Sequence, residues 1–150
     1  MTMKKILALV VLMLILVSAS DFNSDKKTAF HSIEGTWELT SFYNYDGENV
    51  TDTVLASDGY RQVKMYYNGK IMWSRYVPKD KTARFGYGSY IISNDELIET
   101  IEYGDNEMMK ALDTMRVFTF ELKLENDSYS QISQDGEGNR IFSENYRRID

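Results

Sequence analysis

From residue 36 onward, apolar and polar residues alternate in short runs that are separated by turn-forming residues. Such runs, rich in Tyr, Phe, Val and Ile, predict strands of a half-buried sheet. Eight candidate strands follow from this pattern: Thr36–Asn44, Tyr60–Tyr67, Lys70–Val77, Tyr87–Ser93, Glu96–Tyr103, Arg116–Leu124, Ser128–Ser133 and Arg140–Ile149. One helix is predicted over Asp105–Met115, with Asp105 as its N-cap and with Met and Leu residues near helical spacing.

The links between these strands alternate between short and long. Asn68-Gly69 is a two-residue hairpin signal, Asn94-Asp95 is equally tight, and Glu125-Asn126-Asp127 is also short. The long links are Tyr45–Gly59, Pro78–Gly86, the helical segment and Gln134–Asn139. In an up-and-down antiparallel sheet, alternate links lie at the same end, so the tight turns are expected to gather at one end. Closure removes the exposed edges of such a sheet, which predicts an all-β, eight-stranded, up-and-down antiparallel barrel. The alternative is an open sheet or sandwich of the same strands.

The first twenty residues follow a different pattern. Lys4-Lys5 precedes an unbroken apolar run from Ile6 to Val17, and the small residues Ser18-Ala19-Ser20 follow it. This order is typical of a cleavable secretory signal peptide, because the apolar run is too short to span a membrane. The alternative is an uncleaved N-terminal anchor. We predict a signal peptide over residues 1–20, a flexible leader over 21–32 and a barrel domain over 33–150 of a periplasmic or secreted protein.

The amino-acid composition limits the classes of molecule that this chain is expected to bind. The chain contains no Cys, so its core must hold the domain together without disulfides, and no lipid anchor on a Cys is expected. Without residues 1–20, the 17 basic residues fall to 15 against 23 acidic ones, a net charge of −8. Such an acidic domain argues against binding to nucleic acid or to anionic membrane surfaces. The single histidine, His31, precedes the barrel, so we expect no zinc site, no haem and no His-based catalytic triad.

Several motifs occur in an order that resembles a known group of proteins. They are Gly35-Thr36-Trp37-Glu38-Leu39, Gly59-Tyr60-Arg61-Gln62-Val63-Lys64, Met72-Trp73, Gly88-Ser89-Tyr90, Ile98-Glu99-x-Ile101-x-Tyr103 and Glu144-x-Tyr146-x-Arg148. With these motifs, the chain from Ile33 to Ile149 resembles the small exported lipocalin-like proteins of Bacteroides-type bacteria, in the calycin superfamily. The resemblance implies a fold more securely than an activity, because this group has no settled function.

The resemblance also bears on which strand face points inward. It implies that Lys64 and Glu99 lie inside the barrel, where buried charges would need each other as partners. A period-two pattern alone leaves the opposite phase open, with Val63 and Met65 inside and Lys64 in water.

Two sets of candidate residues follow. The candidate ligand-binding residues are Lys64, Tyr66, Trp73, Tyr90, Glu99, Phe118, Phe120 and Glu144. Among these, Phe118 and Phe120 belong to a strictly apolar strand face, which is predicted to point inward. The candidate structural residues, at the tight end, are Gly35, Trp37, Arg147 and Arg148. One of the two arginines would stack on Trp37, and strand parity does not choose between them.

The sequence thus predicts a protein that binds a small amphipathic or hydrophobic molecule in its barrel, without a cofactor or a metal. Val54-Leu55 in the first long link, together with Met108, Met109 and Leu112 of the helix, would act as lids. Two alternatives stay open. One is a barrel enzyme with Glu99 or Glu144 as acid or base. The other is a packed barrel without a cavity that serves as a protein-interaction module in the cell envelope.

Overall fold

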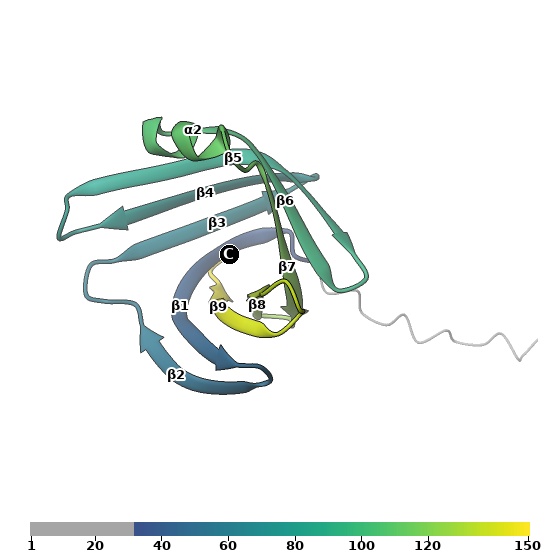
Figure 1. Ribbon diagram of the computed structural model, residues 1–150. Helices are drawn as coiled ribbons and strands as arrows, with labels where there is room; N and C mark the ends of the chain where they lie inside the picture. The colour runs from purple at the N-terminus through teal and green to yellow at the C-terminus, as the bar shows by residue number, and fades with distance from the viewer. Residues whose placement is uncertain (1–31) are drawn as a thin grey trace, which may run out of the picture. The chain divides into compact units, whose positions relative to one another are not determined.

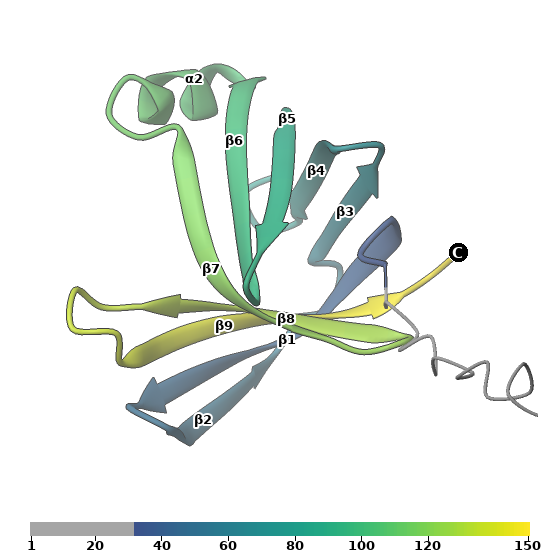
Figure 2. The same ribbon diagram turned by 90° about the vertical axis from the view of Figure 1, so that its right-hand side faces the viewer.

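The computed structural model of the protein describes residues 32–150, which form nine β-strands and one short helix (Figure 1). The strands are β1 (Gly35–Asp46), β2 (Asn49–Leu55), β3 (Arg61–Tyr67), β4 (Lys70–Val77), β5 (Thr82–Ser93), β6 (Glu96–Gly104), β7 (Val117–Leu124), β8 (Ser128–Gln134) and β9 (Arg140–Arg148). The helix α2 (Asn106–Leu112) lies between β6 and β7 (Figure 2). The predicted signal peptide, and the predicted leader up to His31, lie outside the described residues.

Eight of the strands close into a barrel. Neighbouring strands pair antiparallel in the order β1-β3-β4-β5-β6-β7-β8-β9. The last strand pairs back onto the first, from Trp37 opposite Arg148 to Asn44 opposite Phe142. Figure 1 shows β1 curving between β3 and β9, the two strands that it joins. The predicted all-β antiparallel barrel with one short helix is therefore confirmed.

The ninth strand corrects the prediction of a long loop over Tyr45–Gly59. β1 continues to Asp46 and turns through Gly47-Glu48 into β2, which pairs with the second half of β1. All seven residues of β2 are exposed, so no apolar face distinguished this strand in the sequence. The available signal was Asp46-Gly47, a dipeptide typical of two-residue hairpins, followed by a run of β-branched residues.

The link between β4 and β5 is also shorter than predicted. β5 begins at Thr82 instead of Tyr87, so that the turn comprises only Pro78–Lys81. The sequence interpretation took Gly86 as a turn residue, whereas Gly86 is buried within β5, opposite Trp73. A Cβ at this position would lie 2.5 Å from Trp73 Nε1, so the glycine allows the indole ring to approach the strand.

The helix begins where the sequence predicts and ends earlier. The Asp105 side chain accepts hydrogen bonds from the backbone N–H groups of Glu107 and Met108, as an N-cap does. The last helical residue is Leu112, not Met115, and Leu112 is buried in the core. No helix in residues 32–150 is long and apolar enough to cross a membrane.

The three tight turns gather at one end of the barrel, as their alternation with longer links predicts. The carbonyl of Gly69 accepts a hydrogen bond from the N–H of Tyr90 at 3.0 Å. In the same way, Asp95 accepts from Leu122 at 2.7 Å, and Asp127 accepts from the N–H of Arg148 at 2.9 Å. Each tight turn thus accepts a backbone hydrogen bond from the strand that follows its own hairpin. We call this end the closed end, and the opposite end, which carries α2, the open end.

Trp37 fills the closed end. Its side chain is fully buried, and its Nε1 donates a hydrogen bond of 2.7 Å to the carbonyl of Ile33. Its ring meets the ring of Tyr129 edge to face, with 4.9 Å between the centroids. This arrangement satisfies the one polar atom of the side chain while burying its large apolar surface.

Arg148, not Arg147, stacks on Trp37. The two residues are opposite each other in the β1–β9 pairing, which places their side chains on the same face. Arg148 Cζ lies 4.2 Å from the Trp37 ring centroid, and the guanidinium also donates to the carbonyls of Ser32, Glu34 and Asn126. Gly35 has a φ of +140°, and a Cβ there would overlap this guanidinium. Arg147 instead donates to Glu38 at the surface.

Candidate functional site

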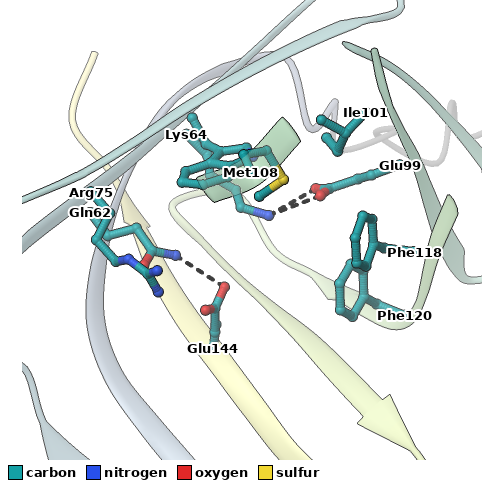
Figure 3. A pocket seen from close by; sticks show the side chains of 10 residues that line it. Gln62, Lys64, Arg75, Glu99, Ile101, Met108, Phe118, Phe120 and Glu144 are labelled. Atoms are coloured by element: carbon teal, nitrogen blue, oxygen red, sulfur yellow. Dashed lines mark hydrogen bonds and ion pairs between the residues drawn. The ribbon is translucent and has the colours of Figure 1, made fainter. Parts of the chain in front are cut away.

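A cavity of about 280 Å³ lies inside the barrel. Its lining comes from β3, β4, β6, β7 and β9 and from helix α2 (Figure 3). The lining residues are Gln62, Lys64, Trp73, Arg75, Glu99, Ile101, Met108, Phe118, Phe120 and Glu144. Side chains from strands far apart in the sequence meet here because every second residue of each strand points into the barrel.

The lining is divided into an apolar wall and a polar wall. Figure 3 shows Phe118 and Phe120 on one side of the space and Gln62, Arg75 and Glu144 on the other. The apolar wall belongs to the neighbouring strands β6 and β7, whereas the polar wall belongs to β3, β4 and β9. A molecule in this cavity would therefore meet hydrocarbon on one side and hydrogen-bonding groups on the other.

Lys64 and Glu99 form a buried ion pair between the two walls. Their side chains are only 5% and 4% exposed. Lys64 Nζ donates to both carboxylate oxygens of Glu99, at 2.9 and 3.1 Å. Glu99 Oε1 also accepts a hydrogen bond of 2.5 Å from the Tyr66 hydroxyl. The inward orientation implied by the resemblance is confirmed, and the opposite phase is wrong, since Met65 is 43% exposed.

Gln131 connects this ion pair to the second interior carboxylate. Its side-chain oxygen accepts from Lys64 Nζ at 2.7 Å, and its side-chain nitrogen donates to Glu144 Oε2 at 2.9 Å. The same oxygen of Glu144 accepts from the Tyr146 hydroxyl at 2.6 Å and from Gln62 Nε2 at 3.2 Å. The interior polar groups thus form one connected network, which fixes their positions before any ligand arrives.

Three tyrosines in the barrel interior, Tyr66, Tyr129 and Tyr146, are buried and have strongly raised pKa values. Burial raises the pKa of Tyr66 well above its ordinary value, and the charge of Glu99 raises it further. Burial likewise raises the pKa of Tyr129, and burial together with the charge of Glu144 raises the pKa of Tyr146. These shifts keep the hydroxyls protonated in the folded protein; Tyr66 donates to Glu99, Tyr146 donates to Glu144, and Tyr129 lies 3.3 Å from the Tyr66 hydroxyl.

This protonation predicts a loss of stability at alkaline pH. The unfolded tyrosines release their protons near pH 10 and the folded ones do not, so unfolding becomes more favourable as pH rises above that value. Each buried tyrosine contributes a slope of about 1.4 kcal/mol per pH unit in that range, and none below it. Tyrosinate absorbance and circular dichroism followed together would show 3 of the 11 tyrosines ionising only as the protein unfolds. Ionisation of all eleven in the folded protein would contradict this.

Six of the eight predicted ligand-binding residues line the cavity: Lys64, Trp73, Glu99, Phe118, Phe120 and Glu144. Tyr66 and Tyr90 do not line it. They meet edge to face at 5.0 Å, and Tyr90 is bonded to the turn at Gly69, toward the closed end. Tyr66 reaches the site only through its hydrogen bond to Glu99. That the six residues contact a ligand stays a prediction.

The sequence interpretation did not name the other four lining residues as ligand-binding residues: Gln62, Arg75, Ile101 and Met108, the last of which was predicted as a lid. The first three lie two residues from selected ones on the same strand face, beside Lys64, Trp73 and Glu99 respectively, so strict alternation would have found them. Of the predicted lid residues, only Met108 borders the cavity. Leu112 is buried in the core, Met109 is exposed on the helix, and Val54 and Leu55 are exposed on β2. Within residues 32–150, no three His, Cys, Asp or Glu side chains gather as a metal site requires.

Two crystal structures share this arrangement of strands. A lipocalin-like protein from Bacteroides uniformis ATCC 8492 aligns with a TM-score of 0.54, over 77% of this chain and 97% of its own, at 16% sequence identity. The fold is lipocalin-like. An uncharacterized protein from Bacteroides eggerthii DSM 20697 aligns with a TM-score of 0.51, over 79% of this chain and 100% of its own, also at 16% identity. No protein-family model and no curated protein matches the chain.

The lipocalin-like fold confirms, at the level of structure, the resemblance that the sequence motifs indicated. Small closed barrels can enclose one small molecule among their inward-pointing side chains. At 16% identity the two structures establish the fold of this chain and leave its ligand to be argued from its own side chains.

Proposed function

We propose that this lipocalin-like protein binds a small amphipathic or hydrophobic molecule inside its barrel. The observation that carries the proposal is the two-walled cavity of about 280 Å³. Small-molecule sites are concave and mostly apolar, carry a few well-placed polar groups and measure roughly 300–1,000 Å³. A cavity of about 280 Å³, just below that range, suits a compact ligand and not a long flexible chain.

Binding would draw on two contributions. Apolar contact with Ile101, Phe118 and Phe120 would stabilise the complex by about 25 cal/mol for each Å² of apolar surface that is buried. The polar wall would orient the ligand, and its side chains are already held by the network around Gln131. Groups fixed in advance lose little conformational freedom on binding, which favours affinity.

The cavity also bears on the alternative functions. A barrel packed by its own side chains would leave no such space, so the cavity supports a binder over an interaction module. The hydrogen bonds that converge on Glu99 and on Oε2 of Glu144 hold these carboxylates in place, as expected of orienting groups. Export by the predicted signal peptide would place this binder in the periplasm or outside the cell.

Binding can be tested with N-phenyl-1-naphthylamine, a neutral aromatic fluorophore whose emission rises in apolar sites. We expect saturable binding of one molecule per chain. A Phe118→Asn variant removes part of the apolar wall and should weaken binding about 10-fold, which corresponds to about 1.4 kcal/mol. The matched control is Val117→Asn, which alters the exposed face of the same strand and should leave the affinity unchanged. Absence of saturable binding, or equal effects of the two variants, would refute the proposal.

A further inference from the structure

Four charged residues line the cavity, and Arg75 is the cation among them that forms no ion pair with a carboxylate in the described part of the chain. Lys64 and Glu99 pair with each other, and three neutral donors surround Oε2 of Glu144. The Nε atom of Arg75 is buried and has no hydrogen-bond partner among residues 32–150. Within that part of the chain, the ion pairs involve other arginines and leave Arg75 without a carboxylate.

A buried donor without a partner is energetically unfavourable. Leaving such a group unsatisfied costs about 1–3 kcal/mol, and more when the group is charged. An acceptor oxygen brought by a ligand would remove this cost. Carboxylate and sulfonate oxygens match the planar donor fork of arginine best, because two of them can accept in parallel.

The position of Arg75 in the barrel predicts how a bound ligand is oriented. Arg75 follows Trp73 on the inward face of β4 and pairs with Arg84, close to the β4–β5 turn at the open end. Lys64 pairs with Trp73, one step nearer the closed end. A charged group at Arg75 would therefore lie toward the open end, while the body of the ligand extends inward along the phenylalanines of β7.

The neighbours of Arg75 do not replace such an anion. Gln62, opposite Arg75 in the β3–β4 pairing, directs its side-chain nitrogen to Glu144 and Tyr146. Burial raises the pKa of Tyr60 more than the Arg75 side chain, which lies within hydrogen-bonding reach of this hydroxyl, lowers it, so the hydroxyl remains neutral and cannot serve as a counter-ion. The charge of Glu144 acts against an anion, but its Oε2 is already surrounded by three neutral donors.

We infer that Arg75 binds an anionic group of the ligand, and that the cavity selects compact molecules that carry one carboxylate or sulfonate. This inference rests on the proposed function and narrows it to a chemical class. It makes Arg75 a specificity-determining residue, whereas Phe118 and Phe120 provide affinity for any apolar body of suitable size.

The test compares two probes with the same aromatic body. 1-Anilinonaphthalene-8-sulfonate carries a sulfonate, and N-phenyl-1-naphthylamine lacks it. An Arg75→Gln variant should weaken binding of the sulfonate at least 10-fold and change the affinity for the neutral probe less than 2-fold. Arg75→Lys, which keeps the charge without the fork, should recover part of the affinity for the sulfonate. Arg61→Gln, on the outer face of β3, is the control and should change neither value.

The experiment distinguishes failure of the inferred role of Arg75 from failure of the proposed ligand binding. If both probes bind saturably and Arg75→Gln leaves their affinity ratio unchanged, the role of Arg75 is refuted while ligand binding stands. If neither probe binds saturably to the unmodified protein, the proposed function fails as well. Circular dichroism of each variant establishes that it is folded. Should Arg75→Gln not fold, Arg75→Met, which keeps much of the length of the side chain without its charge, gives the same decision.

Discussion

A Glu99→Met variant is expected to unfold with a free energy about 3–5 kcal/mol lower than that of the unmodified protein. This substitution removes one partner of a buried ion pair and leaves Lys64 as an uncompensated charge in the barrel interior. It also removes the acceptor of the Tyr66 hydroxyl, whose remaining neighbour is the hydroxyl of Tyr129 at 3.3 Å. Urea unfolding followed by circular dichroism measures the loss.

Three further variants, Lys64→Met alone, the double variant and Glu102→Met, isolate the effect of the pair. The double variant Lys64→Met, Glu99→Met replaces both charges by apolar side chains, and should lose less than the sum of the two single losses. Glu102→Met breaks the ion pair with Lys70, whose partners are about half exposed, and should cost no more than about 1 kcal/mol. A double loss equal to the sum, or a Glu99→Met loss as small as that of Glu102→Met, would contradict the buried pair.

A Trp37→Ala variant is expected to lose about 3–5 kcal/mol of unfolding free energy, the usual cost of removing a fully buried aromatic side chain. The substitution leaves a cavity at the closed end and removes the ring on which Arg148 stacks. None of the residues that line the ligand cavity is itself changed, although Lys64 is opposite Trp37 in the β1–β3 pairing. The folded fraction of the variant should therefore bind N-phenyl-1-naphthylamine with unchanged affinity, as measured by fluorescence titration.

Trp73→Ala is the natural counterpart, because Trp73 borders the cavity and is only partly buried. We expect a smaller loss of stability and a weaker affinity for the neutral probe. The two tryptophans would then separate a stabilising end of the barrel from a binding end. The reverse outcome, with Trp37→Ala weakening binding more than Trp73→Ala, would contradict this separation.

The strands of the barrel could be predicted because most of them bury one face. Their period-two patterns, and the dipeptides Asn68-Gly69 and Asn94-Asp95, located the hairpins correctly. β2 escaped prediction because both of its faces are exposed, so that its sequence contains no contrast between inside and outside. The start of β5 escaped because Gly86, which accommodates the ring of Trp73, has the same sequence signature as a turn.

The residues that line the cavity were harder to predict from the sequence than the strands were. Alternation placed Phe118 and Phe120 inside, but it could not decide the phase of β3, where the inward face carries Gln62, Lys64 and Tyr66. These polar residues can be buried because side chains on other strands satisfy their hydrogen bonds, as Glu99 and Gln131 do for Lys64. A pattern along one strand contains no information on such partners. For the same reason, the unpartnered Nε of Arg75 is visible only in the folded structure.

The most direct test of the account uses the two tryptophans of the chain as reporters. Each contributes one indole N–H signal to a ¹H–¹⁵N spectrum, and a Trp37→Phe variant assigns them. Titration with N-phenyl-1-naphthylamine is expected to shift the Trp73 signal saturably, because the ring current of a ligand in the cavity acts on it. The Trp37 signal, whose N–H is bonded to the Ile33 carbonyl at the closed end, should stay in place. A saturable shift of Trp37 alone, or no shift of either signal, would contradict a ligand site in this cavity.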